Sequence, residues 1–309
     1  MQKFDRLNRI GDHWKKKYGA KTYKLIFRGE FTCPNIDGSL SNKGCIYCNM
    51  RSLEPLIDSK NIEGHIKYLE DRNNAELFIA FFQDFSSTYP VHSIENKHDY
   101  LKKLYTSSID NDKVVGISIS TRPDCINTEV LDILAELQKD VIIELGLQTT
   151  CEKDIKWINR GYANDQFIES VEMIRSYGFN TVVHIILGLP NETDRTILEN
   201  VKFINALKIH GIKFHQLMVL KNTELENIFN KGEVNVLDIQ EYFRRVSLFL
   251  AHLDKNIIIH RLYGDAPKKD LIEPLWCLNK TGIQDKLFDY LEEHNIWQGM
   301  HPRPTTHNP

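Results

Sequence analysis

The chain has 309 residues, of which 41% are hydrophobic and 26% charged, and it carries a formal net charge of −3. This length suits one large α/β domain with an appendage or two domains of ordinary size, and the composition excludes a largely disordered chain. No apolar run reaches the roughly 20 residues of a membrane span, and the N-terminus lacks the apolar stretch of a signal peptide, so we expect a cytoplasmic protein without a membrane segment.

The first segment of the chain, residues 1–21, is basic. Residues 1–30 contain nine Lys and Arg against three Asp and Glu, a local charge of +6, and Phe4, Trp14, Tyr18 and Tyr23 stand among these charges. Such a mixture suits contacts with phosphates and stacking on bases. A solvated basic helix packed on the rest of the fold explains the same pattern, so both interpretations stay open.

Six short β-branched or apolar runs follow between residues 22 and 220, and amphipathic segments separate them. Alternation of this kind is typical of βα units and a parallel sheet. Six units predict an α/β fold, a partial (β/α)6 TIM-like barrel over residues 22–220, with the functional residues at the C-terminal ends of the strands. The predicted strands are 23–27, 76–82, 114–120, 141–147, 180–189 and 212–220.

Two of the intervening helices have readable ends. The helix predicted at 127–139 has Asn127 or Thr128 as its N-cap. The helix predicted at 192–211 closes on Gly211, because glycine tolerates the positive φ that often follows a helix end.

The alternation stops after residue 220, and residues 221–309 are predicted to form a small α/β C-terminal extension. Its motif HRLYGDAP is expected to shape a pocket, with Arg261 and Asp265 as the polar candidates. The elements expected in the extension are a helix at 236–253, a strand at 257–264 and a helix at 282–294.

Three of the six cysteines, Cys33, Cys45 and Cys48, lie on the loop that follows the first predicted strand. Clustered cysteines in a reducing compartment indicate metal ligands or reactive thiols rather than a disulfide framework. A closed zinc site takes four ligands, so zinc requires a fourth such as His65 or His92, and this alternative stays open. An iron-sulfur cluster held by only three cysteines leaves one iron open to bind a small molecule such as S-adenosylmethionine (SAM).

These motifs resemble the radical SAM superfamily. The chain is most similar to its YhcC/YtqA-type group, which is related to the catalytic subunit of Elongator, and the eleven residues between Cys33 and Cys45 match the longer gap of Elongator-type members. The resemblance implies a [4Fe-4S] cluster held by Cys33, Cys45 and Cys48, SAM as the second cofactor, and an electron donor such as flavodoxin or ferredoxin. The matching motifs are FTCPNIDGSLSNKGCIYCN, FFQDFSSTYP, ISISTRPDC, ELGLQT, INRGY, HIILGLPNET and HRLYGDAP.

The same resemblance implies a set of SAM contacts on the later strands. Gln83 is expected near the amino group of SAM and Ser120 at a position that faces the ribose. Ordinary structural roles compete with three assignments: Glu144 paired with Arg122, Arg160 as a helix cap, and His184 as a satisfied core histidine. The full predicted set is Tyr47, Gln83, Ser120, Arg122, Glu144, Gln148, Arg160, His184 and Gly188.

The substrate that the resemblance implies is tRNA, and the reaction is a wobble-uridine side-chain modification that converts a carboxymethylaminomethyl group to an aminomethyl group. The basic N-terminal segment agrees with this expectation. Two alternatives are a radical SAM enzyme that acts on a small metabolite or a porphyrin-like molecule, and a zinc-stabilised RNA-binding protein without catalysis.

Overall fold

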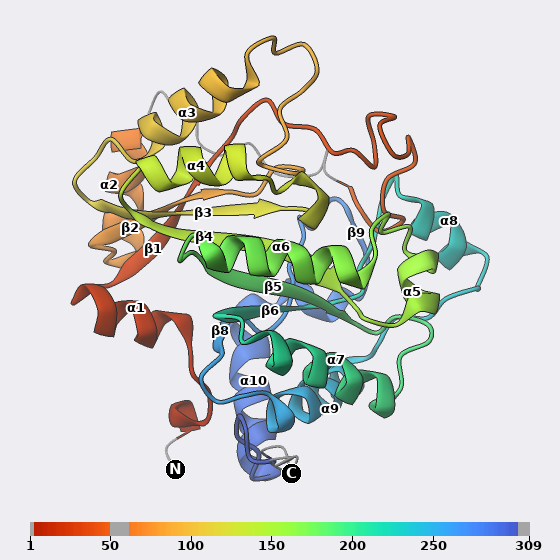
Figure 1. Ribbon diagram of the computed structural model, residues 1–309. Coiled ribbons are helices and arrows are strands. Elements are labelled where there is room, and N and C mark those ends of the chain that lie inside the picture. The colour runs from red at the N-terminus through yellow and green to blue at the C-terminus, as the bar shows by residue number, and fades with distance from the viewer. Residues whose placement is uncertain (1–2, 50–61, 302–309) are drawn as a thin grey trace, which may run out of the picture.

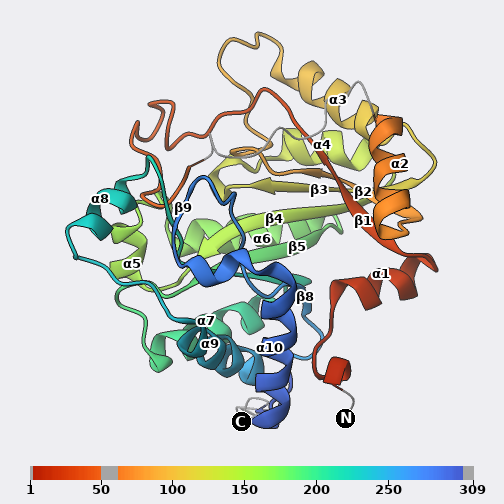
Figure 2. The same ribbon diagram turned by 180° about the vertical axis from the view of Figure 1, so that it is seen from behind.

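The computed structural model describes residues 3–49 and 62–301. Its main sheet has seven parallel strands in the order of the chain, β1-β2-β3-β4-β5-β6-β8, and they curl into a half-barrel (Figures 1 and 2). The predicted α/β partial barrel is therefore confirmed. The seven strands are β1 Thr22–Phe27, β2 Leu77–Phe82, β3 Val114–Thr121, β4 Asp140–Gln148, β5 Asn180–Leu187, β6 Gly211–Gln216 and β8 Ile258–Arg261.

Helices follow most of the strands, and α4, α6 and α7 lie on the outer face of the sheet (Figures 1 and 2). Asn127 caps α4, since its side chain accepts a hydrogen bond from the Val130 amide. The helices are α1 Ile10–Tyr18, α2 Ile62–Asn73, α3 Lys97–Ser108, α4 Thr128–Glu136, α5 Glu152–Trp157, α6 Asn164–Ser176, α7 Asp194–Leu207, α8 Glu224–Asn230, α9 Ile239–His252 and α10 Lys280–Glu293. Short 3₁₀ turns lie at Lys3–Arg6, Pro123–Cys125 and Leu275–Leu278, and a small second sheet pairs β7 Val219–Leu220 with β9 Leu271–Glu273.

The seventh strand comes from the segment predicted as the C-terminal extension. Strand β8 pairs in parallel with β6, so the sheet continues beyond residue 220. The division of the chain into an N-terminal segment, a barrel and an extension stays a prediction.

The predicted helix end at Gly211 is wrong. Helix α7 ends at Leu207, Lys208 takes the left-handed conformation with φ 50°, and Gly211 opens strand β6. A Cβ atom on Gly211 would lie 2.6 Å from the His260 ring, so this glycine serves close packing between strands instead of a helix end.

Two aromatic residues of helix α1 pack against the barrel. Helix α1 contacts both edge strands, β1 and β8, and its Trp14 is buried with Ile79, Ile142 and Val182. The hydroxyl of the half-buried Tyr18 donates to Asp140 at 2.6 Å, and Lys17 pairs with the same carboxylate at 2.7 Å. The burial of Trp14 and the hydrogen bond of Tyr18 favour the interpretation of this segment as a helix packed on the fold.

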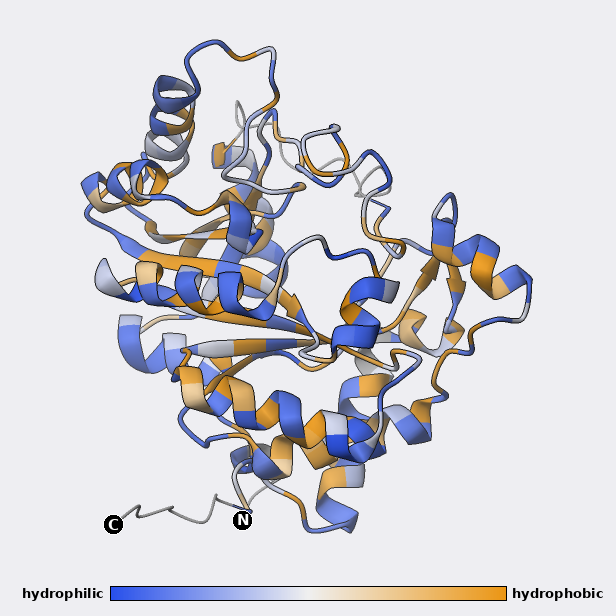
Figure 3. Ribbon diagram, turned by 45° about the vertical axis from the view of Figure 1, so that its right-hand side comes forward, coloured by the Kyte–Doolittle hydropathy of each residue, from blue (hydrophilic) through white to orange (hydrophobic). Residues whose placement is uncertain are grey.

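Apolar side chains fill the space between the sheet and its outer helices, and polar residues cover the outer sides of those helices (Figure 3). In the two described ranges, no helix is long and apolar enough to cross a membrane.

Candidate functional site

A cavity of about 270 Å³ lies at the C-terminal ends of the barrel strands. The βα loops and strand ends of a parallel barrel converge there, so side chains from distant parts of the sequence meet. All three loop cysteines line this cavity, together with residues from β2, β3, β4, β5, β6 and β8. Its polar lining residues include Tyr47, Gln83, Ser120, Arg122, Glu144, Gln148, His184, Lys213, His215 and Arg261.

The cysteine loop is held against the barrel by backbone and side-chain hydrogen bonds. The Ile46 amide donates to the Ile158 carbonyl at 3.1 Å, and the Asn159 side chain donates to the Gly44 carbonyl at 2.6 Å. The Asn35 amide nitrogen lies 3.6 Å from the Cys45 sulfur. These contacts fix the loop so that its thiols face the cavity.

The thiols lie in a buried setting. Burial raises the pKa of the Cys33 and Cys45 thiols, and the Arg122 guanidinium opposes this shift. That guanidinium makes a bidentate pair with Asp124, at 2.8 and 2.6 Å, and lies over the Tyr162 ring at 4.8 Å. A fixed positive charge beside the thiols favours their thiolate form, which is the form that binds metal.

The three thiols supply the donor set of an iron-sulfur cluster that keeps one iron open. Such a cluster takes each thiolate at a different iron, and an iron without a protein ligand can bind a small molecule. Cys33, Cys45 and Cys48 all line the same cavity, so their thiols could hold one group there. Within the two described ranges, no group of three or more His, Cys, Asp and Glu side chains is arranged to hold a single metal ion.

Below the cysteines, three charged residues and one serine interact in the interior of the barrel. We call this group the charged layer: Lys24, Ser118, Glu144 and Lys213. Glu144 forms ion pairs with both lysines and accepts a hydrogen bond from the Ser118 hydroxyl at 2.7 Å. Both ammonium groups lie over the Phe81 ring, at 3.8 and 4.7 Å from its centroid. The alternative pairing of Glu144 with Arg122 is therefore wrong.

Two histidines stand above this layer. The His184 Nε2 lies 2.9 Å from a Glu144 oxygen, and the His184 ring stacks on His215 with 5.2 Å between centroids. Burial lowers the pKa of His184 to about 4, so His184 is neutral at physiological pH. Burial disfavours the ionised form of Glu144, but the Lys213 and Lys24 ammonium groups outweigh this and hold its pKa well below the usual range.

Seven of the nine predicted SAM contacts line the cavity. Among them, Ser120 donates to Glu144 at 3.3 Å, and Gln148 takes a positive φ of 64° at the end of β4. These side chains therefore share a cavity with the cysteines, and their contacts with SAM stay predictions. The seven are Tyr47, Gln83, Ser120, Arg122, Glu144, Gln148 and His184.

The other two predicted contacts lie outside the cavity lining. Arg160 is completely buried, and its guanidinium donates to the backbone carbonyls of Leu147, Thr149 and Tyr162 at 2.7 to 3.1 Å. The Arg160 guanidinium is thus occupied by backbone carbonyls at the end of β4 and in the segment that follows it. Gly188 has φ 97°, and a Cβ atom there would lie 3.0 Å from Leu237, so this glycine permits close packing against the C-terminal segment.

The sequence interpretation missed Lys24 and Lys213. Each lysine has a hydrophobic residue on both sides in its strand, in the runs TYKLIF and GIKFHQ. A charge at such a position indicates a buried partner, because an unpaired ammonium is rarely buried. That signal was present, but the partner on β4 could not be read from the sequence.

Residues 40–204 match the family described as the Radical SAM superfamily, and residues 209–293 match its C-terminal domain. The chain belongs to the radical SAM superfamily. The predicted resemblance to the YhcC/YtqA-type group is confirmed as well. The chain is 32% identical to the Bacillus subtilis protein YtqA over 95% of this chain and 92% of that protein.

More distant similarity leads to Elongator-like proteins. The chain is 21% identical to the tRNA uridine(34) acetyltransferase of Methanocaldococcus jannaschii, over 80% of this chain and 48% of that protein. The structure of the archaeal Methanocaldococcus infernus Elp3 aligns with a TM-score of 0.64 at 15% identity, over 90% of this chain and 64% of that one. As a radical SAM protein, this chain is an enzyme of a family that uses a [4Fe-4S] cluster and SAM.

Proposed function

We propose that Cys33, Cys45 and Cys48 hold a [4Fe-4S] cluster whose open iron binds SAM, and that the enzyme modifies the wobble uridine of tRNA. The observation that carries this proposal is the shared cavity. All three thiols of the radical SAM loop line it together with polar residues from the ends of β2, β3 and β4. When bound, the cluster supplies the electron that cleaves SAM, and a donor such as flavodoxin or ferredoxin restores it.

The residues of this chain orient SAM and exclude water from it. Gln83, Ser120 and Gln148 offer hydrogen-bonding groups at the cavity wall. The half-buried Tyr47, which stands between two of the cysteines in the sequence, lines the same space. Glu144 has a supporting role, because its two oxygens already bind lysine, serine and histidine groups. Arg160 supports the loop after β4 from behind.

The choice of tRNA rests on the relatives. One relative is named a tRNA uridine(34) acetyltransferase, and the fold aligns with an archaeal Elp3. The exposed Lys15 and Lys16 of α1 offer positive charge for a polyanion. The reaction we propose converts carboxymethylaminomethyl to aminomethyl at the wobble uridine, in the cytoplasm. SAM acts as the two-electron oxidant of the carboxymethyl carbon and leaves as methionine and 5′-deoxyadenosine. Water then breaks the bond between this carbon and the side-chain nitrogen, and the two-carbon unit leaves as glyoxylate.

Nucleoside mass spectrometry of tRNA from a deletion strain tests this proposal. The strain is expected to accumulate carboxymethylaminomethyl uridine and to lack the aminomethyl form. The wild-type gene should restore the wild-type profile, whereas the Cys45→Ala gene should not. An unchanged wobble-uridine profile in the deletion strain would refute the tRNA assignment and favour a small metabolite or a porphyrin-like substrate.

A further inference from the structure

The central cavity carries more positive than negative charge. Among the described residues that line it, Glu144 is the one acid, and the bases are Arg122, Lys213 and Arg261. The Arg122 guanidinium is already bound by Asp124 through a bidentate pair. Glu144 is shared between Lys213 and the lysine of β1, so the lining can accept a further anionic group.

Arg261 is the base best placed to receive this group. Its guanidinium is 3.8 Å from the nearest Asp265 oxygen, which is longer than a hydrogen bond, and 38% of its side chain is exposed. It stands at the end of β8, where the cavity meets a second pocket. Because the contact with Asp265 is long, the planar Arg261 guanidinium can still bind the carboxylate of another molecule.

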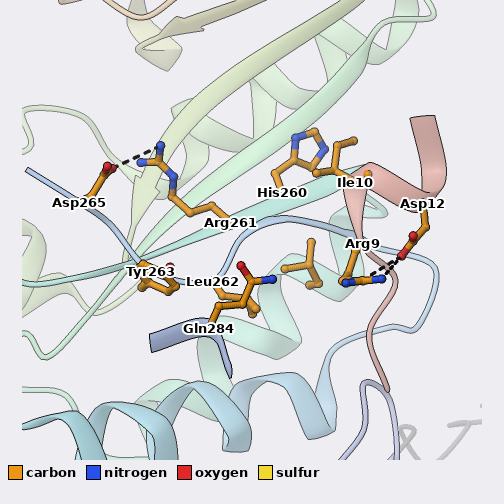
Figure 4. A pocket seen from close by; sticks show the side chains of 11 residues that line it. Arg9, Ile10, Asp12, His260, Arg261, Leu262, Tyr263, Asp265 and Gln284 are labelled. Atoms are coloured by element: carbon orange, nitrogen blue, oxygen red, sulfur yellow. Dashed lines mark hydrogen bonds and ion pairs between the residues drawn. The ribbon is translucent and has the colours of Figure 1, made fainter. Parts of the chain in front are cut away.

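The second pocket, which we call the side pocket, has a volume of about 450 Å³ and lies along β8 (Figure 4). Tyr263, Asp265 and Gln284 line it on one side, and Arg9 and Asp12 of the N-terminal segment line it on the other (Figure 4). Among the described lining residues, Arg261 alone belongs to both the side pocket and the central cavity. This guanidinium therefore borders both spaces, and a group that it binds can lie in the cavity that the cysteines line.

The position of Arg261 is fixed by the segment that follows it. The Gly264 amide donates to the Gln216 side chain at 2.9 Å, and the Gln216 side chain donates back to the Gly264 carbonyl at 2.9 Å. A Cβ atom at Gly264 would lie 2.9 Å from the His215 ring, so a glycine is needed for this approach. The reciprocal pair holds the residues after β8 against β6 and thereby orients the guanidinium.

We infer that Arg261 is a specificity residue that binds the carboxylate of the substrate's wobble side chain, with Lys213 deeper in the same cavity. This inference rests on the function proposed above. The carboxymethylaminomethyl group ends in a carboxylate, and the aminomethyl product has none. Arg261 therefore distinguishes the substrate from the product. The aminomethyl tRNA, which lacks the carboxylate, binds more weakly than the carboxymethylaminomethyl tRNA.

Binding of two tRNA forms tests this role. The anaerobically reconstituted holoenzyme is titrated at one fixed salt concentration with tRNA that carries carboxymethylaminomethyl uridine, and separately with tRNA that carries aminomethyl uridine. The wild-type enzyme should bind the first form roughly 10- to 100-fold more tightly, the size expected for hydrogen bonds to a charged group. Arg261→Met should bring the ratio close to one, and Arg261→Lys should give an intermediate ratio.

A matched control is Arg195→Met on the outer helix α7, where the arginine side chain is 87% exposed and pairs with Glu199. This variant should keep the wild-type ratio. Thermal denaturation of both Met variants separates a loss of specificity from a loss of folding.

Several outcomes overturn the inference. If Arg261→Met keeps the wild-type ratio, Arg261 does not read the carboxylate. If that variant also weakens SAM binding, Arg261 binds the carboxylate of SAM instead. If the wild-type enzyme converts the carboxymethylaminomethyl form yet binds both forms equally, the inference fails and the proposed function stands. A wild-type enzyme that does not convert the carboxymethylaminomethyl form refutes both.

Discussion

The barrel interior contains two layers that lie close together and differ in character. Its floor consists of Ile79, Ile142 and Val182, with Trp14 of α1 packed beneath them, and all four are buried apolar residues. Two residues further along β4, the inward position is Glu144 of the charged layer. Alternate residues of a strand face the same side of the sheet, so Ile142 and Glu144 both point into the barrel. The barrel interior therefore changes from apolar to charged within two residues of β4.

The difference shows how one sheet supplies both stability and function. The floor closes the barrel from the N-terminal side with apolar side chains. Above it, Glu144 and Lys213 interact in a setting of low dielectric, where ion pairs strengthen if each charge has a partner. If the two layers have separate roles, a change in the floor should lower stability and leave SAM binding intact.

The largest expected effect on stability comes from Glu144→Gln in the charged layer. This change leaves the buried Lys213 and the half-buried Lys24 without their carboxylate, so the free energy of unfolding should fall by about 3 to 5 kcal/mol in urea denaturation. Adding Lys213→Met should restore part of the loss, because one unpaired charge is removed. Equal losses in the single and double variants would contradict the proposed coupling.

Next in size is Trp14→Ala in the floor. Removing this buried ring leaves a cavity under β2, β4 and β5, and the free energy of unfolding should fall by about 3 kcal/mol. The exposed Lys15→Ala on the same helix is the matched control and should change stability by less than about 0.5 kcal/mol. SAM affinity should stay close to wild type in both variants, and a selective loss of SAM binding in Trp14→Ala would contradict the division between floor and site.

The next prediction concerns the dependence of the free energy of unfolding on pH. The pKa of His184 is about 4 in the folded protein, and an unfolded histidine titrates near 6.5, so the unfolded chain binds the extra proton as pH falls. Unfolding free energy should therefore decline between about pH 6.5 and pH 4, by up to about 1 kcal/mol per pH unit for this group.

The variant His184→Gln should flatten that slope in part. Buried His215 and His260, whose pKa values burial also lowers, still contribute in the variant. Stability measured by urea denaturation at several pH values checks the slope, and an unchanged slope in His184→Gln would show that His184 is not a source of acid sensitivity.

The sequence predicted the strands well because apolar β-branched runs carry a local signal. Strand β8 was assigned to the extension, since its place beside β6 depends on a pairing of residues far apart in the sequence. Gly211 looked like a helix end, but the His260 ring packed against it explains the glycine.

The candidate site was predictable where chemistry is encoded in spacing and not where it depends on long-range pairing. The three cysteines and the polar strand ends were found because each lies next to a recognisable strand. Lys24 and Lys213 were missed because their common partner, Glu144, is on a distant strand. Arg160 has the right chemistry for a carboxylate, but the fold uses its guanidinium for backbone carbonyls.

The most direct test of the central claim is the yield of 5′-deoxyadenosine from anaerobically reconstituted protein given SAM and dithionite, with iron and sulfide measured on the same sample. The wild-type protein should hold about four irons and form 5′-deoxyadenosine, and Cys45→Ala should form none. Cys151→Ala, whose cysteine lies outside the cavity lining, should match the wild type. Full activity of Cys45→Ala, or a colourless wild-type protein with stoichiometric zinc, would contradict the account.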